Sequence, residues 1–192
     1  KSSAASDVYK RQVYAYATDK RLEIERPNVK IPKDAPVQPK TILQPDEIKL
    51  LFSEDSIMHH GKAKQCFYIH AWRFIVATGL RRGELCGIET SHIIGNVVHI
   101  QQAINRLGST TPGKNSNANR SFVLSRHAEA ILENQRAMLR SMGIISPWVF
   151  PAPDGGPADP NTVYRTWKTY RQQHGIKSNL HELRHTLISI AK

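Results

Sequence analysis

Two short segments of the sequence carry residue types whose spacing could serve chemistry at a phosphate. The first is TGLRRGEL at residues 78–85. Gly79 lets the backbone turn as an apolar segment ends, so the arginines that follow emerge at the edge of the core. A guanidinium placed there can bind a phosphate through two hydrogen bonds, and Glu84 can orient Arg81. A turn between two helices with solvated arginines is an equally good interpretation of this segment alone.

The second segment is HELRH at residues 181–185, and it fits two patterns. As HExxH, it would place His181 and His185 one helical turn apart as ligands of Zn²⁺, with Glu182 activating water. As HxxR, it would place His181 and Arg184 on one helical face as donors to a single phosphate. The second pattern suits phosphoryl transfer and needs no metal.

The zinc interpretation lacks a third ligand near the motif. Catalytic zinc takes three protein ligands, and residues 186–192 contain no His, Cys, Asp or Glu. The third ligand would have to come from upstream in the chain, where His59, His60 and His70 are candidates. The phosphate interpretation accounts for Arg81 as well, and we therefore favour it.

The net charge also indicates a polyanionic partner. The chain of 192 residues has 27 Lys and Arg against 16 Asp and Glu, a net charge of +11. Basic side chains that neutralise phosphates gain free energy from counterion release, so nucleic acid is the first candidate. The 39 residues from Thr90 to Ala128 contain no acidic residue. Such a stretch could follow a phosphate backbone, and an ordinary solvated hairpin is the alternative.

Composition sets the class of protein. With 40% hydrophobic and 22% charged residues, the chain can bury a core and form one domain, or one domain with a fragment of another. No apolar run approaches the ~18 residues of a membrane span, and the polar start lacks a signal-peptide core. The two cysteines, Cys66 and Cys86, lie in apolar segments and fit a reducing compartment. We expect an intracellular protein.

The elements that position the two motifs follow from helix and strand signals. Residues 1–12 look like a translated sequencing adapter, residues 13–28 begin with a short helix, and the proline-rich residues 29–40 form a linker before a domain at 41–192. Within this domain we expect a helix from Pro45, a buried helix at 62–79, strands flanking Gly95 and Asn96, a third strand at 120–124, helices at 126–142 and 160–174, and a last helix capped by Ser178. The predicted fold is mainly α with a small antiparallel β-sheet, an α+β class.

The two motifs, in this order and about a hundred residues apart, resemble the tyrosine recombinases of the phage integrase family. The resemblance covers residues 41–192 and implies the catalytic-domain fold of that family, incomplete at its C-terminus. It makes residues 13–28 the remnant of the preceding core-binding domain. It also implies a role in DNA recombination and integration as part of a mobile genetic element.

The resemblance assigns roles to individual residues. It implies that Arg81, Lys114, His181 and Arg184 are catalytic, that Glu84 and His185 support them, and that Arg82, Arg106 and Arg120 bind DNA. In the family mechanism a tyrosine attacks a DNA phosphate and keeps the bond energy in a 3′-phosphotyrosine, while the lysine protonates the leaving 5′ oxygen. The resemblance implies no cofactor or metal, double-stranded DNA as the partner, tetramers on DNA and a cytoplasmic, prokaryotic or phage-encoded protein.

The sequence departs from the family pattern after the second motif. The family places another His or Trp and then the nucleophilic tyrosine beyond the HxxR helix, and this sequence ends eight residues after Arg184. Tyr164 and Tyr170 precede His181 and are expected to pack or to contact phosphate. We therefore predict a fragment that binds DNA without cleaving it. The alternatives are a zinc hydrolase using His181, Glu182 and His185, and a DNA-binding module without catalysis.

Overall fold

The structure is a computed structural model that describes residues 12, 16, 17, 19, 20, 42–112 and 119–190. The chain divides into two units, Lys1–Pro39 and Lys40–Lys192. The segments predicted at 1–12, 13–28 and 29–40 lie outside the described residues, apart from the five positions below residue 42. The helices and strands named below belong to the second unit.

The second unit combines helices with short antiparallel strands, which confirms the predicted fold class. In chain order the elements are α2 (Pro45–Ser53), β1 (Ser56–His59), β2 (Lys62–Gln65), α3 (Ile69–Thr78), α4 (Arg82–Cys86), the 3₁₀ turn η1 (Thr90–His92), β3 (Ile93–Ile94), β4 (Val97–Ile100), β5 (Gln102–Ile104), β6 (Thr110–Pro112), β7 (Arg120–Val123), α5 (Arg126–Ser141), α6 (Pro160–Gln173) and α7 (Leu180–Ile190). The strands form the hairpins β1–β2 and β5–β6 and the three-stranded sheet β3–β4–β7.

Most of the predicted elements are present. The hairpin around Gly95 and Asn96 pairs Ile94 with Val97, and β7 adds the third strand by pairing with β4. The helices α5 and α6 match the predicted ranges to within one residue at each end. Ser125 caps α5, and Asp159 caps α6, where Pro160 stands at the first helical position.

The prediction of a buried helix over 62–79 is wrong in its first part. Residues 62–65 form strand β2, all four exposed, and the helix begins only at Ile69. The strand belongs to a hairpin whose turn residues, His60 and Gly61, have φ values of 50° and 73°. Such left-handed residues suit a two-residue hairpin turn and interrupt a helix.

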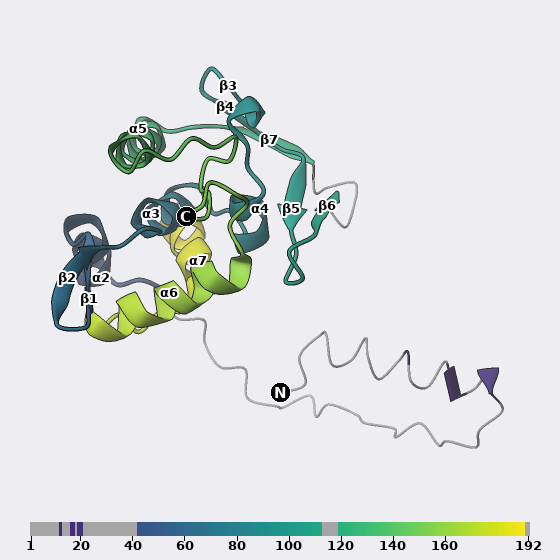
Figure 1. Ribbon diagram of the computed structural model, residues 1–192, viewed down its shortest axis with the longest axis horizontal. Coiled ribbons are helices and arrows are strands. Elements are labelled where there is room, and N and C mark those ends of the chain that lie inside the picture. The colour runs from purple at the N-terminus through teal and green to yellow at the C-terminus, as the bar shows by residue number, and fades with distance from the viewer. Residues whose placement is uncertain (1–11, 13–15, 18, 21–41, 113–118, 191–192) are drawn as a thin grey trace. The chain divides into compact units, whose positions relative to one another are not determined.

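Helix α3 is the centre of the core. It packs against α5 and α7, which lie on different sides of it (Figure 1). Every residue from Ile69 to Val76 is buried. The ring of Trp72 lies edge-on to Trp167 of α6, with centroids 5.0 Å apart, and 5.2 Å from the centroid of Tyr170. This aromatic cluster joins α3 to α6.

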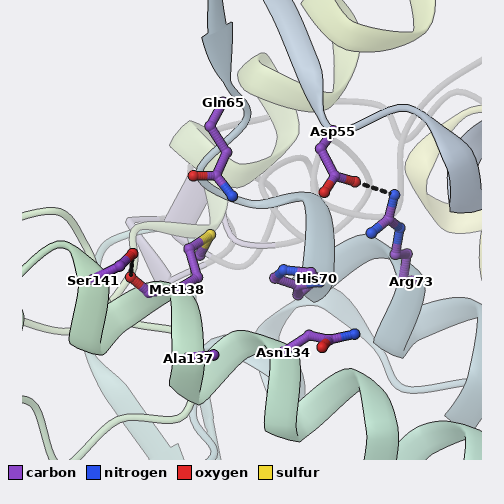
Figure 2. Close-up of a pocket in the computed structure, with 8 residues that line it drawn as sticks. All are labelled: Asp55, Gln65, His70, Arg73, Asn134, Ala137, Met138 and Ser141. Carbon is purple, nitrogen blue, oxygen red and sulfur yellow. Dashed lines mark hydrogen bonds and ion pairs between the residues drawn. The ribbon is translucent and has the colours of Figure 1, made fainter.

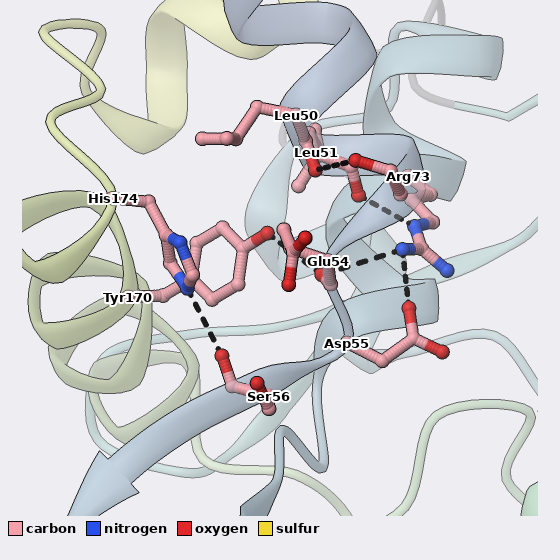
Figure 3. Close-up of polar contacts among 9 residues, drawn as sticks. Leu50, Leu51, Glu54, Asp55, Ser56, Arg73, Tyr170 and His174 are labelled. Carbon is pink, nitrogen blue, oxygen red and sulfur yellow. Dashed lines mark hydrogen bonds and ion pairs between the residues drawn. The ribbon is translucent and has the colours of Figure 1, made fainter. Parts of the chain in front are cut away.

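A buried arginine on α3 and a buried tyrosine on α6 both hold the end of α2 through polar contacts (Figure 3). Arg73 Nε donates to the carbonyl of Leu51 over 2.8 Å, and its guanidinium forms an ion pair with Asp55. The Tyr170 hydroxyl on α6 donates to the carbonyl of Glu54 over 2.8 Å, and Arg73 Nη2 reaches the same carbonyl at 3.4 Å. These contacts satisfy carbonyls at the end of α2 and fix it to α3 and α6.

Candidate functional site

The first motif forms the turn between α3 and α4. Gly79 ends α3 in the left-handed region, with φ of 67°, and its N–H donates to Ile75. A Cβ atom at Gly79 would also lie 3.2 Å from Cδ2 of Leu187 on α7, so the last helix packs closely over this turn. Arg81 follows as the N-cap residue of α4. The sequence interpretation of Gly79 as the helix end is confirmed.

The carboxylate of Glu84 is the hub of the site, because four N–H groups converge on it. Arg81 donates to it twice, from its backbone N–H at 2.8 Å and from Nη1 at 2.8 Å. Arg120, at the start of β7, donates from Nη1 to Oε1 at 3.0 Å and from Nη2 to Oε2 at 2.8 Å. Each carboxylate oxygen therefore accepts two hydrogen bonds, and two arginines share one acid.

The hydrogen bonds determine the charge state of Glu84. Its side chain is 8% exposed, and this burial by itself raises the pKa of the carboxyl group. The hydrogen bonds from Arg120 and Arg81 outweigh burial and hold the pKa at about 2, below the ordinary 4.5. Glu84 is therefore ionised at neutral pH.

The second motif brings a third arginine to the same place. Burial lowers the pKa of Arg184, and the positive charges of Arg81 and Arg120 lower it further, while Glu84 opposes them. Its Nη1 is buried and finds no hydrogen-bond partner among the described residues. Three guanidinium groups around one carboxylate leave an excess of positive charge at this point. An anion that accepts from Arg184 would satisfy the unpaired donor.

The start of α7 sets the direction of the second motif. Asn179 caps the helix: its Oδ1 accepts from the backbone N–H groups of His181 at 2.9 Å and Glu182 at 3.1 Å. Glu182 reaches back to accept from the Asn179 N–H at 2.7 Å, which completes a capping box. The prediction that Ser178 is the cap is wrong, because Ser178 is buried and precedes the capping residue.

The comparisons with known proteins agree with this geometry. The profile of the phage integrase family matches residues 41–190, which include both motifs. The chain belongs to the phage integrase family. This places it among the tyrosine site-specific recombinases, with the fold of their catalytic domain. No curated protein matches the sequence significantly.

Solved structures of integrases and recombinases resemble this chain over about half to two thirds of their own length. The Tn1549 transposon integrase in complex with a circular intermediate DNA has a TM-score of 0.70 and 18% identity, over 99% of this chain and 67% of that one. The XerA recombinase has a TM-score of 0.58 and 20% identity; the match covers 100% of this chain and 62% of that one. A lambda integrase tetramer bound to a Holliday junction has a TM-score of 0.60 and 17% identity; the match covers 92% of this chain and 49% of that one.

In the structure, the HExxH pattern at residues 181–185 lies at the capped start of α7. The rings of His181 and His185 lie edge to face with centroids 5.0 Å apart, while Glu182 belongs to the helix cap. Within the described part of the chain, no group of three His, Cys, Asp or Glu side chains could hold a metal ion. These contacts do not favour the zinc hydrolase. The sequence alone could not show that the Glu182 carboxylate is used in the helix cap.

The remaining predicted site residues are Lys114, Arg82, Arg106 and Arg120. Lys114 lies outside the described residues. The guanidinium of Arg82 lies 5.5 Å from the ring centroid of Tyr164, and burial followed by the charge of Arg106 lowers the pKa of Arg82. Arg82 and Arg106 are therefore neighbours near α6. Arg120 instead turns to Glu84, a contact across 36 residues of sequence that no local spacing indicates.

Two glycines let α4 dock directly on strand β5. A Cβ atom at Gly83 would lie 2.7 Å from the backbone oxygen of Ile104, and one at Gly87 would lie 3.0 Å from the oxygen of Gln102. The two glycines are four residues apart, so they share one face of the short helix. This close approach holds the helix that carries Arg81 and Glu84.

We predict that Gly83→Ala destabilises the chain by about 1–3 kcal/mol, because the added methyl collides with a backbone oxygen that cannot rotate away. In open space the same change inside a helix would stabilise by about 1 kcal/mol. The free energy of unfolding, measured by urea denaturation, gives the sign. Gly156→Ala, in a loop, is the control for a glycine without a backbone clash, because the three atoms nearest to its Cβ would all belong to the side chain of Asp154. Equal stability of Gly83→Ala and wild type would contradict the close packing.

A separate pocket of about 430 Å³ lies where α3 faces α5 (Figure 2). His70 and Arg73 line it from α3, and Asn134 and Met138 line it from α5. Burial lowers the pKa of His70, and the charge of Arg73 acts in the same direction, so the imidazole is neutral at pH 7. The pocket shares no residue with the cluster around Glu84.

None of the described helices combines the length and the apolar composition needed to cross a membrane.

Proposed function

We propose that this chain carries the phosphate-binding centre of a site-specific DNA recombinase that breaks and rejoins strands through a 3′-phosphotyrosine. The observation that carries the proposal is the buried Nη1 of Arg184, which lies near the charges of Arg81 and Arg120 and has no hydrogen-bond partner in the described part of the chain. A DNA phosphate is an anion that such a donor can bind. The DNA complexes of the Tn1549 and lambda integrases, which share the fold, support the same partner.

In this proposal, Arg81 and Arg184 act on the same phosphate. Glu84 fixes the Arg81 guanidinium on one side, and the exposed 59% of the Arg81 side chain remains open to a ligand. As the phosphate becomes pentacoordinate, its oxygens gain negative charge. Donors already in place stabilise that charge without reorganising. His181 would assist proton transfer, and Lys114 would protonate the leaving 5′ oxygen.

The surface residues complete the proposed interface with duplex DNA. Arg82 and Arg106 would contact backbone phosphates beside the scissile one, with Tyr164 supporting the Arg82 guanidinium. Contacts of this kind position the protein on DNA without reading sequence. The lambda integrase tetramer on a Holliday junction supports self-association on DNA for this chain as well.

We propose that none of the described tyrosines of the second unit is the nucleophile. Tyr68 is buried, and burial raises its pKa to about 12. Tyr170 is buried too, and its hydroxyl donates to the carbonyl of Glu54. Tyr164 lies against Arg82. With a suicide DNA substrate we therefore expect no covalent adduct on these three tyrosines, and an adduct mapped to any of them would contradict this.

Duplex binding by fluorescence anisotropy tests the phosphate site. We predict that Arg81→Ala weakens binding several-fold and reduces the slope of log K against log salt by about 0.9, the value for one phosphate contact. Arg136→Ala, an exposed arginine on α5, removes the same charge away from the site and should change neither quantity as much. Equal effects of the two variants, or no binding by the wild type, would refute the proposal.

A further inference from the structure

We infer that Arg120 is a positioning residue, which holds Glu84 so that Arg81 stays available to a phosphate. The inference rests on the proposed function and deepens it. It differs from the sequence-based expectation, in which Arg120 is itself a DNA contact. The two roles require different directions of the guanidinium, and in the structure it points toward Glu84.

The Arg120 guanidinium is fully engaged on the side that faces Glu84. Both terminal nitrogens donate, one to each carboxylate oxygen, at 3.0 and 2.8 Å. This parallel pair uses the planar fork of arginine, which a lysine cannot reproduce with a single ammonium group. The side chain is 33% exposed, against 59% for Arg81. Of the two arginines on this carboxylate, Arg120 is the inner one.

The consequence for Arg81 follows from the lone pairs of Glu84. A guanidinium has five N–H donors, and the structure places one of those of Arg81 on the carboxylate, at Oε1. Oε2 already accepts from Arg120 and from the Arg81 backbone. Without Arg120, Oε2 would have room for a second side-chain bond from Arg81. The two residues would then form a closed bidentate pair and turn the Arg81 donors away from a phosphate.

The ion pair also fixes the carboxylate in space. Arg120 is the first residue of β7 and pairs with Ile100 of β4 in the three-stranded sheet. Glu84 lies on α4, which has only 5 residues. The contact therefore joins a short helix to a sheet strand at the residue that orients Arg81. A fixed Glu84 means a fixed Arg81, which is what a site preorganised for an anion needs.

The test uses the 192-residue chain, inorganic phosphate and the side-chain N–H resonance of Arg184 followed by NMR. We expect Arg120→Ala and Arg120→Lys each to weaken phosphate binding by about tenfold, the value of a hydrogen bond to a charged group. The lysine variant keeps the positive charge, so it separates positioning from simple attraction. In the Arg81→Ala background, adding Arg120→Lys should cause no further loss, because the residue acts through Arg81.

Each outcome decides between roles. Binding restored by Arg120→Lys would show a direct phosphate contact and overturn the inference. A further loss in the Arg81→Ala background would show direct contact or general damage to the fold, and would also overturn it. If the wild-type Arg184 resonance does not respond to phosphate, or if Arg81→Ala binds phosphate as the wild type does, the proposed function itself fails. The two failures are therefore distinguishable.

Discussion

Replacing Glu84 with glutamine is expected to lower the free energy of unfolding by about 3 kcal/mol at neutral pH. A shift in the carboxyl pKa from 4.5 to about 2 corresponds to this magnitude. The physical reason is that two arginines lose the negative charge they share. The Glu84 side chain is 8% exposed, so solvent replaces little of that interaction. Removing one partner of a buried ion pair leaves uncompensated charge and is costly.

The pH dependence of this difference gives it a specific signature. The pKa of Glu84 is lower in the folded chain than in the unfolded one, so its stabilisation is fully present above the unfolded value of 4.5. It is lost as the pH falls through that value toward about 2, because the carboxylate becomes protonated. The difference between wild type and Glu84→Gln should therefore shrink toward zero over this acid range.

Urea denaturation at a series of pH values measures the difference directly. Glu133→Gln, on the exposed face of α5, removes the same charge without a buried partner and should change stability by less than about 0.5 kcal/mol. Comparing variants cancels the titration of the other carboxyl groups. A destabilisation by Glu84→Gln that stays constant across the acid range would show that lost packing, and not the shared charge, causes it.

Local signals explain why the helices and the first half of the site were predictable. Pro45 and Pro160 mark helix starts through rules that depend only on neighbouring residues. The pairing of Arg81 with Glu84 is also local, since the two residues are three apart on one turn. Helix starts and the pairing of Arg81 with Glu84 can be read from the sequence because each depends on residues within a single helix or turn.

The hairpins β1–β2 and β5–β6 could not be predicted, because the alternation of apolar and polar residues in the sequence does not indicate them. The four residues of β2 are all exposed, so the strand has no apolar face to reveal it. Strand β5 is held by the close approach of α4 at Gly83 and Gly87, which is a tertiary contact. The hydrophobic pattern alone indicates neither hairpin, because one depends on backbone conformation in an exposed strand and the other on contact between distant segments.

The role of Arg120 shows the same limit at the candidate site. In the sequence it belongs to a stretch without acidic residues that could follow a phosphate backbone, and the family resemblance makes it a DNA-binding residue. The acid that binds it lies 36 residues earlier, on a different element. Only the fold brings the pair together. The net charge indicated the class of partner, whereas the fold determines which arginines remain open to that partner.

Replacing Trp167 with alanine is expected to lower the free energy of unfolding by about 3–5 kcal/mol, because it leaves a large cavity between α3 and α6. Trp167 is fully buried, and its ring packs edge-on to Trp72 and parallel to Tyr170, whose centroid lies 5.9 Å away. Urea denaturation at neutral pH measures the loss.

Tyr164→Ala is the matched control for this variant, because it removes an aromatic ring from the same helix at a position that is 42% exposed. It should cost only about 1 kcal/mol, mostly the cation–π contact with Arg82. Helix α6 also contacts α7, which carries Arg184, so a loss of α6 packing should loosen the proposed phosphate site together with the core. Equal costs for the two variants would mean that the aromatic cluster does not hold α6 to α3.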